Sequence, residues 1–109
     1  MTTYRFGDLI LVAFPFSSGT EAKLRPAMVI LDTGDTDVIA ARVTTQLYQT
    51  PYDLKITEWQ VAGLLAPSVI RLHKLATLEK TAIRRQVGQL LPADCHRAAT
   101  ILRQVTVGT

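Results

Sequence analysis

Residues 7–30, GDLILVAFPFSSGTEAKLRPAMVI, contain the segment that decides the fold. Two apolar runs, residues 9–16 and 27–31, have the length and composition of β-strands, and a polar loop joins them. The loop ends at Arg25-Pro26, which places a guanidinium beside a residue of fixed backbone angle. Arginine stays charged at every physiological pH and its planar donors match a phosphate. The segment therefore predicts two neighbouring strands with a candidate phosphate clamp at their junction.

Four further segments have strand character. They lie at residues 38–46, near 53–56, at 68–75 and near 85–90. The first ends in Thr44, Thr45 and Gln46, so the strand would deliver hydroxyl and amide groups to a rim. Pro51 limits the following strand to an edge or a late start. Residues 59–65 fit no single state, and residues 78–83 suggest one short helical turn.

The last segment predicts a helix. Pro92 suits its first turn, and one face carries the small and apolar residues Cys95, Ala98, Ala99, Leu102 and Val105. Asp94 in the first turn and Arg103 in the last suit the helix dipole. Five or six short strands followed by a helix, without strand–helix alternation, predict a mainly β protein built on a small antiparallel barrel or sheet.

Composition limits the possible classes of protein. With 109 residues, 48% of them apolar, the chain predicts a single domain over residues 1–109. A single cysteine, Cys95, excludes an intrachain disulfide framework and fits a small core residue in a reducing compartment. The longest apolar run is too short to span a bilayer, so we expect a cytoplasmic protein without a membrane anchor. A net charge of +3 is compatible with a polyanionic partner but does not require one.

Several catalytic motifs are absent from the sequence. It contains no glycine-rich phosphate loop, no HExxH pair, no paired-cysteine zinc spacing and no G-x-S-x-G elbow, so we expect no metal and no cofactor. Of the two histidines, His73 could donate a proton but is expected to be a plain exposed residue, and His96 is expected to be solvated on the helix. No pair of acids identifies a general acid and base.

RNA cleavage needs few protein groups, because the 2′-hydroxyl beside the scissile phosphate can act as the nucleophile. The protein holds that oxygen in line and offsets the charge that builds on the phosphorane. Arg25 suits the electrostatic task, but its guanidinium stays protonated and is a poor general base. The Thr44 hydroxyl can hydrogen-bond the same phosphate, and Gln46 can read a base edge. Without further context, Arg25 could equally pair with Glu21 or serve packing, and Thr44 could be a plain strand residue.

An ordered set of motifs resembles the MazF/PemK-type endoribonuclease toxins of bacterial toxin–antitoxin pairs. The set comprises Arg25-Pro26, TTQ at residues 44–46, PYDL at 51–54 and GLLAPSVIRLHKL at 63–75. The resemblance covers nearly the whole chain and implies an SH3-like, partly open antiparallel barrel with a C-terminal helix (MazF/CcdB-like). It also implies a homodimer with an RNA groove, and a catalytic centre at Arg25 and Thr44.

The resemblance also implies partners and contacts. The partners are single-stranded RNA and a cognate antitoxin, a small acidic protein whose disordered tail would compete for the groove. Candidate RNA-binding residues are Lys23, Thr45, Gln46, Tyr48 and Tyr52. Lys23 could instead be a solvated lysine, Thr45 a plain strand residue, and the two tyrosines could stack on bases or cover the barrel mouth. Trp59 is expected in the core or a dimer contact rather than against a base.

One feature departs from the family. The loop at residues 17–24 looks shorter than in many members, so base specificity does not transfer to this chain. Within the loop Ser17, Ser18 and Gly19 are expected to supply turn geometry.

Three functions follow from the resemblance. The leading one is the toxin of a type II toxin–antitoxin system, a metal-independent, sequence-specific endoribonuclease that cuts single-stranded messenger RNA to a 2′,3′-cyclic phosphate and a 5′-hydroxyl. The second is a toxin of the same fold that binds a protein, as the gyrase-poison branch does with an aromatic residue near its C-terminus. Every aromatic residue here lies at or before Trp59. The third is a barrel that binds RNA without cutting it.

Overall fold

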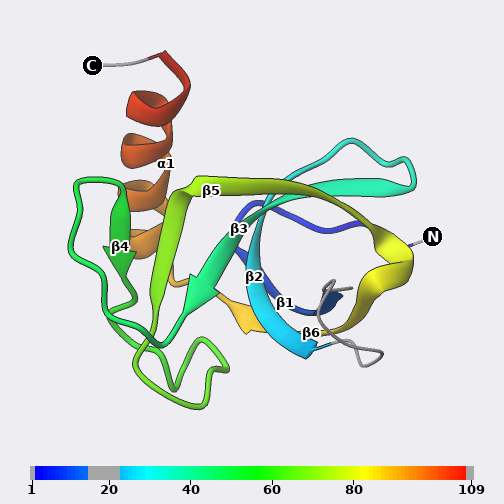
Figure 1. Ribbon diagram of the computed structural model, residues 1–109, viewed down its shortest axis with the longest axis horizontal. Coiled ribbons are helices and arrows are strands. Elements are labelled where there is room, and N and C mark those ends of the chain that lie inside the picture. Colours follow the sequence, from blue (N-terminus) through cyan, green and yellow to red (C-terminus); the bar gives the residue numbers. More distant parts are fainter. Residues whose placement is uncertain (1, 15–22, 108–109) are drawn as a thin grey trace.

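A computed structural model describes residues 2–14 and 23–107 of the chain. Within these ranges six strands form one antiparallel sheet in the order β4-β5-β3-β2-β1-β6, and one helix follows (Figure 1). The elements are β1 (Asp8–Phe14), β2 (Lys23–Asp32), β3 (Asp37–Thr44), β4 (Asp53–Lys55), β5 (Val69–Glu79), the 3₁₀ turn η1 (Lys80–Ala82), β6 (Ile83–Gln89) and α1 (Pro92–Val107). β4 and β6 are the edges, so the barrel is open. The predicted fold, mainly β with a C-terminal helix, is confirmed.

Strand β2 begins earlier than the sequence indicated. Arg25 and Pro26 lie inside it, although the apolar pattern predicted a strand from Ala27. Proline is tolerated because the ladder between β2 and β3 starts only at Ala27, which pairs with Arg42, so no β3 partner needs an N–H from Pro26. Toward β1, Pro26 lies opposite Leu11. The guanidinium of Arg25 is therefore carried by a paired strand and not by a loose loop end.

The remaining bounds differ by a few residues. β3 ends at Thr44, so Thr45 and Gln46 follow the strand. β5 runs on to Glu79, past the predicted range 68–75, because its far half pairs with the start of β3 from Leu75 to Glu79. The predicted short helical turn is confined to η1.

The sheet buries apolar side chains on both faces. Leu9, Met28 and Ala41 pair across β1, β2 and β3 and belong to a first core, which Ala98 and Ile101 of α1 cover. A second core lies on the opposite face and consists of Ile10, Val12, Ala27, Val29, Val38 and Ala40, with Tyr4, Leu78, Ala82 and Ile83 packed against it. Because both faces are buried, the first two strands are continuous apolar runs without alternation.

A buried carboxylate ties helix α1 to the segment that follows β4. Asp94 is 1% exposed and accepts hydrogen bonds from the Thr57 N–H (3.0 Å), the Thr57 hydroxyl (2.6 Å) and Arg97 (2.9 Å). It therefore does more than complement the helix dipole. The prediction that Arg103 lies in the last turn of the helix is wrong, because α1 continues to Val107. Cys95 is half-buried against the first core, and His96 is exposed as expected.

Residues 59–65 form turns that pack against β6. Gly63 and Gly88 lie against each other there. A Cβ on Gly63 would collide with the Val87 carbonyl, and a Cβ on Gly88 with the Ala62 carbonyl. The absence of side chains at this crossing permits the close approach. Trp59 lies in this segment and packs, partly buried, against the first core, which confirms its predicted core role. In the described part of the chain no helix is long and apolar enough to cross a membrane.

Candidate active site

The sheet face that carries the second core becomes polar at one end. Ala27 pairs with Arg42, Arg42 with Arg71, and Arg71 with Asp53, across β2, β3, β5 and β4. Directly paired residues in antiparallel strands point to the same side of a sheet, so these side chains share the face of the second core. The apolar row of the core thus continues into a row of charges.

The two predicted catalytic residues lie on this polar end. Arg25 lies two residues before Ala27 and Thr44 two residues after Arg42, so alternation along each strand keeps both on this face, beyond the Ala27–Arg42 pair at which the β2–β3 ladder ends. Arg25 is exposed and lies opposite Val12 of β1, while Thr44 is half-buried and pairs with Val69 of β5. The strand order therefore places these two residues, which are far apart in sequence, at the same end of one sheet face.

The hydroxyl of Thr44 is oriented by a hydrogen bond from the backbone. Its Oγ1 accepts a 3.1 Å hydrogen bond from the Gln46 N–H, which caps the turn after β3. A hydroxyl that accepts from the backbone still has its proton to donate. Thr44 therefore suits a phosphate oxygen placed above the sheet. Thr45, between them, is exposed.

A network of side chains supports the loop that follows. The Arg71 Nε donates to Asp53 Oδ1 at 2.9 Å, and the Arg71 guanidinium carbon lies 3.6 Å from the centre of the Tyr48 ring. The Tyr48 hydroxyl donates to Gln46 Oε1 at 2.9 Å. Burial acts to raise the pKa of Asp53, but hydrogen bonds from Thr50 and Arg71 outweigh it, so the pKa lies below its ordinary value of 3.8. Asp53 therefore stays ionised and holds Arg71 in place.

His73 differs from its expected state. It is half-buried and not a plain exposed residue, because its ring packs 5.5 Å from that of Tyr52 and its Nε2 lies 3.5 Å from an Arg71 nitrogen. Its Nδ1 is buried with no hydrogen-bond partner among the described residues. Arg42, Arg71, Asp53 and His73 were missed as site residues. The alternation of residues 68–75 already places Arg71 and His73 on one face, but only the β3–β5 and β4–β5 registers add Arg42 and Asp53.

The polar end carries an excess of positive charge. Asp53 neutralises Arg71, whereas neither Arg25 nor Arg42 forms an ion pair with any other described residue. Lys23, at the start of β2, is exposed, and Tyr52 is half-buried beside His73. Glu21, the alternative partner of Arg25, and the predicted turn residues Ser17, Ser18 and Gly19 lie outside the described residues. The described surface here suits an anion.

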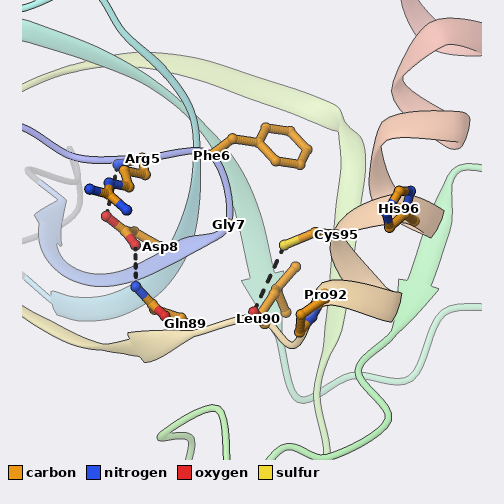
Figure 2. A pocket seen from close by; sticks show the side chains of 9 residues that line it. All are labelled: Arg5, Phe6, Gly7, Asp8, Gln89, Leu90, Pro92, Cys95 and His96. Atoms are coloured by element: carbon orange, nitrogen blue, oxygen red, sulfur yellow. Dashed lines mark hydrogen bonds between the residues drawn. The ribbon is translucent and has the colours of Figure 1, made fainter.

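A separate pocket of about 350 Å³ lies between the start of β1, the end of β6 and the first turn of α1. Figure 2 shows Arg5, Asp8 and Gln89 on one side and Cys95 with His96 on the other. Burial raises the pKa of the Cys95 thiol, and the carboxylates of Asp94 and Asp8 add to the shift. A protonated thiol is a poor nucleophile. Among the described residues, no cluster of three or more His, Cys, Asp or Glu side chains could hold a metal ion.

The described residues thus form an open antiparallel barrel that carries guanidinium groups at one end of its sheet, the architecture of a small mainly β protein. The chain matches the family of PemK-like, MazF-like toxins of type II toxin–antitoxin systems over residues 5–106, and it belongs to that family. A comparison with curated protein sequences found no match.

Solved structures share the fold. An endoribonuclease in complex with its cognate antitoxin from a mycobacterial species is 18% identical, with a TM-score of 0.77 over 95% of each chain. Mycobacterium tuberculosis toxin MazF-mt6 is 20% identical, with a TM-score of 0.77 over 92% of this chain and 96% of that one. MazE–MazF from Deinococcus radiodurans is 15% identical, with a TM-score of 0.80 over 99% and 100%. At these identities the likeness establishes the fold.

Proposed function

We propose that this toxin is a metal-independent endoribonuclease that cuts single-stranded RNA, with messenger RNA as its target in the cytoplasm. The observation that supports the proposal is that Arg25 and Thr44 lie on the same face of two neighbouring strands, at its cationic end. A 2′-hydroxyl attacks the adjacent phosphate, the P–O5′ bond breaks, and the products are a 2′,3′-cyclic phosphate and a 5′-hydroxyl.

Each catalytic residue has a task that suits its chemistry. Arg25 binds the phosphate and offsets the charge of the phosphorane, since its guanidinium is permanently protonated and exposed. Thr44 donates a hydrogen bond from its hydroxyl to a phosphate oxygen, since its Oγ1 already accepts from the Gln46 N–H. Neither residue is a general base, so the proton of the 2′-hydroxyl leaves by another group or through water.

The RNA-binding surface consists of Lys23, Thr45, Gln46, Tyr48 and Tyr52 around the two catalytic residues. Exposed Lys23 contacts a phosphate, and the ring of Tyr52 offers a stacking surface for an unpaired base. Arg42, which has no ion pair among the described residues, adds to the electrostatic attraction.

Two protein partners complete the proposal. Related structures are described as an endoribonuclease with its cognate antitoxin and as a MazE–MazF complex. We infer that this chain forms a homodimer and is inhibited by an acidic antitoxin segment that competes with RNA for Arg25. Charge complementarity supports this arrangement, because the polar end of the sheet is cationic.

The test is cleavage of a long unstructured RNA in the presence of a chelator. Wild-type protein should cut RNA at short sequences and leave a DNA of matching sequence intact. Arg25→Ala and Thr44→Ala should each lower kcat/KM by about 100- to 1,000-fold, as expected for removal of a transition-state hydrogen-bond donor. Arg103→Ala, which removes an exposed arginine from α1, is the matched control and should cut normally. A folded wild-type protein that cuts no RNA would overturn the proposal and favour a toxin that binds a protein.

A further inference from the structure

The loop after β3 is held by a chain of contacts that starts at a fixed carboxylate. Asp53 accepts hydrogen bonds from the Thr50 hydroxyl at 2.6 Å and the Thr50 N–H at 3.0 Å, and its side chain is 1% exposed. The Arg71 side chain, 11% exposed, is fixed by its Nε–carboxylate bond to this group. The guanidinium therefore has little freedom to move away from Tyr48.

The position of Arg71 over Tyr48 determines how the tyrosine hydroxyl behaves. A cation 3.6 Å from the ring centre attracts the π electrons of the phenol. Electron density drawn into the ring leaves the oxygen a weaker acceptor and the O–H a stronger donor, and polarised neighbours strengthen one another along such a chain. The hydroxyl accordingly donates to Gln46 Oε1, at 2.9 Å.

A glutamine amide has an oxygen that accepts at one end and an NH₂ that donates at the other. When it is free to turn about its last torsion, it presents either end to a ligand and distinguishes donors from acceptors poorly. A donor fixed at Oε1 removes that freedom and leaves the NH₂ pointing away from Tyr48. Gln46 then recognises one kind of partner.

We propose that Tyr48 is a specificity-determining positioning residue, which fixes the Gln46 amide so that the site selects an RNA base presenting a hydrogen-bond acceptor. The inference rests on the proposed ribonuclease function and adds the class of base edge that is read. The base belongs to a nucleotide beside the scissile phosphate, because the Gln46 N–H is bonded to the hydroxyl of Thr44.

The experiment sequences the ends produced from a random-sequence RNA library by wild-type protein and by Tyr48→Phe. Phenylalanine keeps the ring beneath Arg71 and removes only the hydroxyl. The wild-type preference at one position, about 5- to 100-fold for a well-made base contact, should fall to less than about threefold. Cleavage by Tyr48→Phe should remain detectable, because Arg25 and Thr44 are still present, so the base preference can be measured at whatever rate the variant has. The ratio of kcat/KM between two bases does not depend on the fraction of folded protein.

Two further variants sharpen the result. Gln46→Glu replaces the NH₂ by a second acceptor oxygen and should shift the preference to bases that present a donor at that position. Tyr4→Phe is the matched control, because it removes a hydroxyl from a ring that packs against the second core and should leave the cleavage profile unchanged.

The outcomes separate the inference from the function it rests on. If wild-type protein cuts with a base preference and Tyr48→Phe retains the same preference, the inference is wrong and the ribonuclease function stands. If Gln46→Glu also retains it, Gln46 does not read the base. If folded wild-type protein does not cut RNA at all, both proposals fail.

Discussion

The hydroxyl of Thr57 lies 2.6 Å from a carboxylate oxygen of Asp94, a residue 37 positions further along the chain. Together with the Thr57 N–H, this contact ties the segment after β4 to the first turn of α1. Asp94→Asn should cost about 1–3 kcal/mol of unfolding free energy, because a buried acceptor becomes a partly unsatisfied amide. Urea denaturation measures the change, and Glu58→Gln, at an exposed acid nearby, is the control. A loss below about 0.5 kcal/mol, the range of ordinary surface substitutions, would show that the contact is not stabilising.

Acid should unfold the protein partly through Asp32. Hydrogen bonds from the Tyr4 and Gly34 N–H groups, opposed by burial and aided by Lys80, hold the pKa of Asp32 below 3.8. A lowered pKa means that the folded state favours the carboxylate. The stabilisation is therefore present above the unfolded value of 3.8 and is lost as the pH falls through the folded pKa. Melting temperatures measured from pH 6 down to pH 2 should fall less steeply for Asp32→Asn than for wild-type, and parallel curves would contradict this assignment.

Gly88 of β6 should not accept a side chain without a shift of the backbone. A Cβ there would meet the Ala62 carbonyl, and a strand and a turn both have to shift to relieve the clash. Gly88→Ala should cost about 1–3 kcal/mol or more. Gly34→Ala is the comparison, because Gly34 has φ +92° but nothing within 4 Å, so its cost of about 1 kcal/mol comes from backbone strain alone. Equal losses in a denaturant titration would argue against the close packing.

Arg42 should contribute to RNA affinity through charge. The probe is an RNA made resistant to cleavage by one 2′-deoxy nucleotide at the cleavage site, and its binding should weaken steeply with added salt. Arg42→Ala should reduce the slope of log K against log salt by about 0.7, the value for one phosphate on a single strand. Arg103→Ala should leave the slope unchanged. Fluorescence anisotropy at several salt concentrations measures both, and an unaltered slope for Arg42→Ala would exclude a phosphate contact.

The sequence was sufficient for the architecture because apolar runs and turn residues report local structure. The strands predicted at residues 9–16 and 38–46 and the helix after Pro92 came from such local patterns; residues 15 and 16 lie outside the described residues, and β3 ends at Thr44 and not at Gln46. The ends of strands were harder to predict where pairing with a neighbouring strand determines them. The extension of β5 to Glu79 depends on its partner β3, and the inclusion of Pro26 in β2 depends on the ladder to β3 beginning one residue later.

The candidate site shows the same division. Arg25 and Thr44 stood out through their chemistry and the family resemblance, but nothing in the sequence places Arg42 beside Arg71 and Asp53. That row exists because β3, β5 and β4 are neighbours in the sheet. His73 was expected to be exposed because it occupies a polar phase of an alternating strand. The ring of Tyr52, in the turn just before β4, packs against it and covers part of it.

Removal of a single oxygen atom from the substrate tests the central claim most directly. An RNA with one mapped cleavage site is prepared twice, with a 2′-hydroxyl or with a 2′-hydrogen on the nucleotide 5′ to the scissile phosphate. If the RNA supplies the nucleophile, wild-type protein in chelator cuts only the first, and its 3′ fragment carries a 5′-hydroxyl that a kinase labels without prior phosphatase treatment. Cleavage of the 2′-deoxy substrate at a comparable rate would contradict the account, because the nucleophile would then have to come from the protein or from water.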